Sequence, residues 1–140
     1  MRPTVSEQLS GISRLLADVV GPEVLDPYAS DVLAGAVPTL ELLADGWARV
    51  APFLRWDIEA TGRVLALAGV DRPPPPEDPL DIEALYECDR RARRLLSEAM
   101  AAVMERPQAR EAAVALFRTR ADRYPIAARP QPRSGGEPSC

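Results

Sequence analysis

An apolar stripe between Pro27 and Gly69 constrains the fold of this chain more than any other feature. Apolar side chains recur there at steps of three and four residues, which places them on one face of an α-helix. The stripe consists of Leu33, Val37, Leu40, Leu43, Trp47, Val50, Leu54, Ile58, Thr61, Leu65 and Ala68. Because an amphipathic helix is stabilised mainly by burial of such a face, we expect the other segments to be helices that cover it.

The stripe leaves open whether these residues form one helix or two. A single helix over 27–68 would be about 63 Å long at about 1.5 Å per residue, which is too long for a compact monomer of this size. We therefore predict a tight turn between Asp45 and Ile58, next to Pro52, and only a kink at Pro38. The unbroken apolar phase across this turn favours the alternative, which is a continuous helix in an elongated dimer.

Local signals mark where the helices begin and end on the N-terminal side. Thr4 and Glu7 form a capping box, which predicts a helix that begins after Thr4. Gly21–Pro22 ends this helix at about Val20, because proline cannot continue it. Asp26 precedes a proline and is therefore predicted to be the N-cap of the central stretch.

A proline-rich connector separates the stripe from a second helical pair. Residues 71–79 read Asp-Arg-Pro-Pro-Pro-Pro-Glu-Asp-Pro, which is typical of a stiff polyproline II segment. Asp78 repeats the N-cap signal, and helices are predicted over 82–104 and 109–124. Residues 125–140 offer no apolar face and are predicted to be a disordered tail. The fold class is therefore all-α: a four- to five-helix up-and-down bundle that forms a single domain over residues 1–124.

The composition narrows the classes of function. All 17 basic residues are arginine, and the net charge of −4 argues against a nucleic-acid partner, which requires a basic face. The chain has no histidine, the commonest metal ligand and the usual general base near neutral pH. We therefore predict no metal, no cofactor and no catalytic residues, and we lean against an enzyme. Cys88 and Cys140 form neither a disulfide framework nor a zinc motif, and the chain begins without an apolar signal, so we expect a cytoplasmic protein with no membrane partner.

Two candidate sites stand out. The first comprises Trp47, Arg49, Phe53, Trp56 and Asp57, where aromatic and charged side chains cluster as they do in binding surfaces. The alternative is that these residues close one end of a bundle and that Asp57 is a capping carboxylate. If Asp57 is partly buried instead, its pKa would be raised and it could act as an acid or base.

The second candidate is an arginine cluster that could bind an anion, formed by Arg90, Arg91 and Arg94 beside Arg93. The alternative is a surface of ordinary ion pairs, Glu87 with Arg91 and Asp89 with Arg93, one helical turn apart.

These patterns favour a non-enzymatic helical interaction module that either self-associates or serves as an accessory subunit of a separate partner protein. The second hypothesis is a helical bundle that binds a small apolar or anionic molecule in a tunnel between its helices. An enzyme that acts alone comes third, since it would have to use carboxylates, hydroxyls, tyrosines and one thiol.

Overall fold

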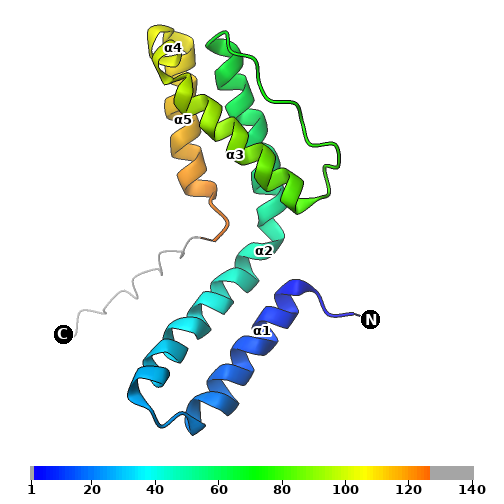
Figure 1. The fold of residues 1–140 in the computed structure, drawn as a ribbon, viewed down its shortest axis with the longest axis vertical. Coiled ribbons are helices and arrows are strands. Elements are labelled where there is room, and N and C mark those ends of the chain that lie inside the picture. Colours follow the sequence, from blue (N-terminus) through cyan, green and yellow to red (C-terminus); the bar gives the residue numbers. More distant parts are fainter. Residues whose placement is uncertain (1, 127–140) are drawn as a thin grey trace, which may run out of the picture.

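The computed structural model describes residues 2–126, and in this part of the chain the protein is all-α, as predicted (Figure 1). The α-helices are α1 (Val5–Leu15), α2 (Pro27–Leu67), α3 (Ile82–Glu98), α4 (Met100–Glu105) and α5 (Pro107–Arg123). A π-helical turn over Leu16–Val20 and a 3₁₀ turn over Gly21–Glu23 connect α1 to α2. The predicted disorder of 127–140 lies outside the described residues.

The predicted turn near Pro52 is wrong, because α2 is one helix of 41 residues that contains both Pro38 and Pro52. Proline removes only one hydrogen bond from a helix and can bend it without ending it, so the unbroken apolar phase prevails over the two prolines. Figure 1 shows α2 changing direction near its middle. The chain does not fold back on itself at Pro52, and α2 is the axis along which the other helices are arranged.

The helix termini follow their capping signals with one correction. Thr4 and Glu7 form the predicted capping box, and the Asp26 carboxylate accepts a hydrogen bond from the Ala29 amide at 2.8 Å. The N-cap of α3 is Asp81 rather than Asp78, because the Asp81 carboxylate reaches two amide groups of the first turn. Asp78 lies in the turn before α3.

The second half of the chain has two further differences from the prediction. The helix predicted over 82–104 is interrupted at Ala99, which separates α3 from α4. The packed part also extends beyond Tyr124, since Pro125 is buried and Ile126 is half-buried. The proline connector itself has no regular helix over 71–77, as expected for a polyproline segment.

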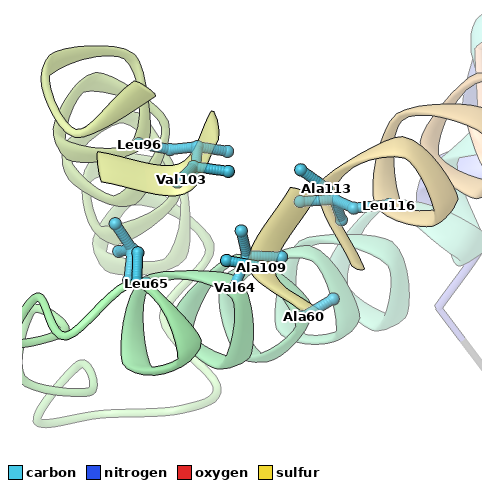
Figure 2. Packing of buried hydrophobic residues seen from close by; sticks show 9 residues of the cluster. Ala60, Val64, Leu65, Leu96, Val103, Ala109, Ala113 and Leu116 are labelled. Carbon is cyan, nitrogen blue, oxygen red and sulfur yellow. The ribbon is translucent and has the colours of Figure 1, made fainter. Parts of the chain in front are cut away.

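The hydrophobic core lies entirely against the C-terminal half of α2. One cluster joins α2 to α3, α4 and α5 through Ala60, Val64, Leu65, Ala68, Leu96, Val103, Ala109, Ala113 and Leu116 (Figure 2). A second cluster consists of Val50, Phe53, Leu54 and Leu85. In contrast, no α2 residue before Ala44 is buried, and α1 buries only Ser13. The first half of α2 and α1 therefore form an antiparallel hairpin that extends away from the core (Figure 1).

We predict that Leu65→Ala lowers the free energy of unfolding by about 2–5 kcal/mol, because it leaves a cavity in the core. Leu65 is completely buried, whereas Leu67, two residues along the same helix, is 42% exposed. Leu67→Ala is the matched control and should change the stability little. Urea denaturation followed by circular dichroism measures both. Equal losses of stability in the two variants would contradict the packing.

Candidate functional site

A buried carboxylate on α2 holds arginines from two other helices. Asp57 is completely buried and accepts a hydrogen bond from Arg93 Nη2 of α3 at 2.6 Å. Its other oxygen accepts from Arg120 Nε of α5 at 2.8 Å, and Arg120 Nη2 also donates to the Thr61 hydroxyl at 3.0 Å. Charge-assisted bonds of this kind are stronger than neutral ones, and burial leaves little screening by water. Asp57 therefore links α2, α3 and α5.

A second carboxylate, Asp89, lies beside this group and is incompletely paired. Asp89 is 5% exposed, and its Oδ2 lies 2.9 Å from Arg93 Nε, although this N–H is not aligned for a hydrogen bond. Its other oxygen, Oδ1, is buried without a hydrogen-bond partner among the described residues. An unpaired buried oxygen is costly, so this atom calls for an explanation.

The pKa of Asp89 is raised from its ordinary value near 3.8 to about 7. Burial is the largest cause, followed by the neighbouring Asp57 carboxylate, which accepts a hydrogen bond from the protonated form of Asp89 and whose negative charge disfavours the ionised form. Arg93 and Arg120 oppose this shift only in part. Two carboxylates close together in the interior do not readily carry two negative charges. Asp89 is therefore partly protonated near neutral pH, whereas Asp57 accepts hydrogen bonds from two arginines.

A pocket of about 190 Å³ adjoins Asp89 and Arg93. Its other lining residues are apolar or aromatic and come from α2, α3 and the segment after α5: Val50, Phe53, Leu54, Tyr86, Tyr124, Pro125 and Ile126. We refer to it as the Asp89 pocket. Phe53 and Tyr124 meet edge to face, with their ring centroids 5.8 Å apart.

The outer wall of the Asp89 pocket is fixed to α2 at two points. Arg49 Nη2 donates to the Pro125 carbonyl oxygen at 3.1 Å. Gly46 lies beneath the same carbonyl, where a Cβ atom would be only 2.5 Å from the oxygen, so any other residue would push the wall away. Part of the segment predicted to be disordered is therefore ordered because Gly46 and Arg49 hold it.

The structure brings only part of the first predicted site together. Arg49, Phe53 and Asp57 all border the Asp89 pocket or its ion pairs, and the possible partial burial of Asp57 is in fact complete. Trp56 packs on Phe53 and lies beneath Arg123 at 4.6 Å, beside the pocket rather than in it. Trp47 is 37% exposed and is not among the residues that line the pocket.

The predicted anion cluster lies on the surface as separate ion pairs. Arg90 and Arg91 both pair with Glu87, and Arg94 pairs with Glu98. All of these side chains are about half exposed or more. The structure therefore favours the ion-paired alternative for Arg90, Arg91 and Arg94, whereas Arg93 faces inward.

Sequence reasoning missed the roles of Asp89, Arg93 and Arg120. The first two were interpreted as an ordinary surface pair, because their four-residue spacing is common on solvated helices. Arg120 gave a usable signal, since it falls on the same face of the last helix as Ala113 and Leu116, both buried. An arginine in an apolar stripe requires a buried acid, and Asp57 is an acid directly beside the apolar stripe of α2.

Two other potential sites lack support in the part of the chain that the structure describes. No group of three or more cysteine or acidic side chains lies close enough to hold a metal ion in residues 2–126. Burial raises the pKa of the Cys88 thiol, which favours the unreactive protonated form. Within the same residues, no helix has the length and apolarity needed to cross a membrane.

Comparison with known proteins adds no information on function, since no protein family, curated protein or solved structure matches this chain. Any function assigned to the chain therefore rests on the packing, charge and exposure of its own residues.

We predict that Asp57→Ala lowers the free energy of unfolding by about 3–5 kcal/mol, because Arg93 and Arg120 would lose their buried counter-ion. Glu59→Ala is the matched control on the same helix, since Glu59 is exposed and lies 4.0 Å from exposed Arg63. Denaturation of both variants measures the effect. A loss for Asp57→Ala no greater than for Glu59→Ala would contradict the linking role of Asp57.

The raised pKa of Asp89 predicts a pH dependence of stability. The folded protein binds this proton more tightly than the unfolded chain, so the contribution of Asp89 is greatest at low pH and falls as the pH rises from about 4 to about 7. Asp89→Asn removes this decrease. The free energy of unfolding of the variant minus that of the wild type should therefore be larger at about pH 8 than at about pH 5, and urea denaturation at both pH values measures it. If the stability difference between variant and wild type is the same at both pH values, Asp89 has an ordinary pKa.

Proposed function

We propose that this protein is a self-associating interaction module and that the hairpin of α1 and the first half of α2 is its interface. The observation that carries the proposal is the amount of apolar side chain left exposed on a hairpin that buries almost nothing of its own. The exposed apolar residues between 5 and 42 are Val5, Ile12, Leu15, Val19, Val20, Leu25, Tyr28, Val32 and Leu42. Exposed apolar side chains that gather on one face of a protein commonly mark interaction surfaces.

The exposed residues form a second stripe on each helix, distinct from the residues packed within the hairpin. On α1, Val5, Ile12 and Leu15 recur at steps of seven and three residues, and at about 100° per residue they are rotated on average by about 60° from half-buried Leu9 and Leu16. Such heptad spacing is typical of helices that pack along their length against a partner helix.

The stripe on α2 follows Tyr28, Val32, Gly35 and Thr39, at four- and three-residue steps. About the helix axis, this stripe is rotated away from the packed residues Leu33 and Leu40. The direction of rotation is the same as that of the α1 stripe relative to the packed residues of α1. Because α1 and α2 are antiparallel, equal senses of rotation place both stripes on one side of the hairpin. A Cβ atom at Gly35 would meet nothing within 4 Å, so this point is open to a partner helix.

A second copy of the chain is the occupant that fits this face best. The two stripes contain no charged residue, and two hairpins placed face to face supply the four helices of a bundle with twofold symmetry. The C-terminal residues 127–140 are unsuited to cover the face, because their prolines, glycines and charges provide no apolar stripe.

The charge of the hairpin provides a way to distinguish a second copy from a basic partner. Residues 2–47 contain seven acidic residues and two arginines. Helical rotation places Asp31 beside the stripe on α2, at the rim of the proposed interface, whereas Glu41 faces α1 and accepts a hydrogen bond from the Ser13 hydroxyl. Two copies would repel each other at the rim, so added salt should strengthen self-association. Binding to a basic partner would be weakened by salt.

We also propose a cytoplasmic location. Its support is Cys88, a free thiol in the protein interior, which suits a reducing compartment.

We predict that Val32→Glu abolishes self-association, because it places a charge in the centre of the apolar face. Ala34→Glu adds the same charge two residues away, on a different side of the same helix, and should leave the dimer intact. Sedimentation velocity over a range of concentrations measures both. A wild-type protein that is monomeric throughout the micromolar range would overturn the proposal, and so would equal effects of the two substitutions.

A further inference from the structure

We propose that the Asp89 pocket is a binding site for a small organic amine in its protonated form, with the ammonium group on Asp89 and the apolar part among Phe53, Tyr86 and Tyr124. This inference concerns the C-terminal half of α2 and is independent of the hairpin. The geometry supports it through an unused acceptor, an aromatic lining and a fixed outer wall.

Two buried polar atoms of residues that line the pocket have no hydrogen-bond partner within residues 2–126, the acceptor Asp89 Oδ1 and the donor Arg93 Nε. The charge of Arg93 Nε is compensated by Asp89 Oδ2 at 2.9 Å, and Arg93 Nη2 and Arg120 donate to Asp57. Asp89 is more than nine-tenths buried, and its Oδ1 has no hydrogen-bond partner within residues 2–126. A ligand that donates a charged N–H would satisfy this oxygen, whereas an anion would meet a second negative charge.

The lining suits a cation with an apolar body. Three aromatic rings, those of Phe53, Tyr86 and Tyr124, contribute to the pocket walls. Ring faces attract ammonium groups, most strongly where water is excluded. Burial raises the pKa of the Tyr86 phenol, so this side chain stays neutral and brings no further charge. A volume of about 190 Å³ is below the range of roughly 300–1,000 Å³ typical of drug-sized ligands, so the amine should be small.

Charge balance is consistent with an ammonium ligand. The charged groups that face Asp89 are Asp57 on α2, Arg93 on α3 and Arg120 on α5. With Asp89 protonated, these four side chains carry one net positive charge, and Asp89 tends to keep its proton because burial and the neighbouring Asp57 outweigh the two arginines. An ammonium group at Oδ1 would replace this proton and leave the net charge of the site unchanged, so binding should release the proton and weaken below about pH 7.

The fixed wall indicates that the pocket exists before a ligand enters. Gly46 and Arg49 hold Pro125 against α2, and Phe53 packs against Tyr124. A preformed cavity avoids the cost of ordering a loop on binding.

Isothermal titration calorimetry at about pH 8, where Asp89 is ionised, tests the proposal with three probes of similar shape: benzylamine, benzyl alcohol and benzoate. We expect saturable binding of benzylamine, weaker binding of the alcohol and no binding of benzoate. Repeating the benzylamine titration at about pH 5 should give at least about tenfold weaker binding. Failure of benzylamine to bind at about pH 8 would overturn the inference, and so would tighter binding of benzoate.

The Asp89→Asn variant tests whether benzylamine binds in the Asp89 pocket, because the substitution keeps the shape of the side chain and removes its charge. We expect benzylamine affinity to fall at least about tenfold, with Glu87→Gln, an exposed carboxylate on the same helix, as the unchanged control. Should Asp89→Asn fail to fold, Tyr124→Leu replaces it and should weaken binding by removing one ring. Unchanged affinity in the folded variant that is tested would overturn the assignment.

Discussion

The packing of the C-terminal half of this protein depends on one buried carboxylate. Asp57 is completely excluded from water and is stable there only because Arg93 and Arg120 approach it from two different helices. The arrangement fixes how α3 and α5 lie on α2, since a shift of either helix would leave a buried charge unpaired. The apolar core of leucine, valine and alanine contributes more burial, but such side chains tolerate small shifts, whereas two charge-assisted hydrogen bonds to one carboxylate do not.

Much of the fold could be predicted from the sequence because helix termini are local. Thr4 with Glu7, Asp26 before Pro27 and the run of prolines act within a few residues and gave the correct elements. The prediction of a turn at Pro52 was wrong because it depended on a global argument, namely that a chain of this length forms one compact body. The stripe itself contained the better evidence, since its phase continues through Pro52.

The site was less predictable, because its residues are distant in sequence. The segment around Asp57 could be selected from the clustering of aromatic and charged residues, and three of its five members border the pocket or its ion pairs. The partners come from α3 and α5, and nothing local distinguishes Arg93 from its neighbours Arg91 and Arg94. Only the meeting of three helices decides which arginine faces inward, and that is a property of the packing.

The two halves of α2 differ in a way that relates the two proposals to each other. From Ala44 onward one face of α2 is buried, and no buried side-chain polar atom on that part of the helix lacks a hydrogen-bond partner, which suits a preorganised pocket. Before Ala44 its outer stripe lies open, and an isolated helical hairpin in water is marginally stable. A second hairpin would bury that stripe without contacting the Asp89 pocket, whose residues all lie beyond position 49. The bend near the middle of α2 therefore separates a hairpin whose outer apolar stripe is exposed from a half whose apolar face is buried (Figure 1).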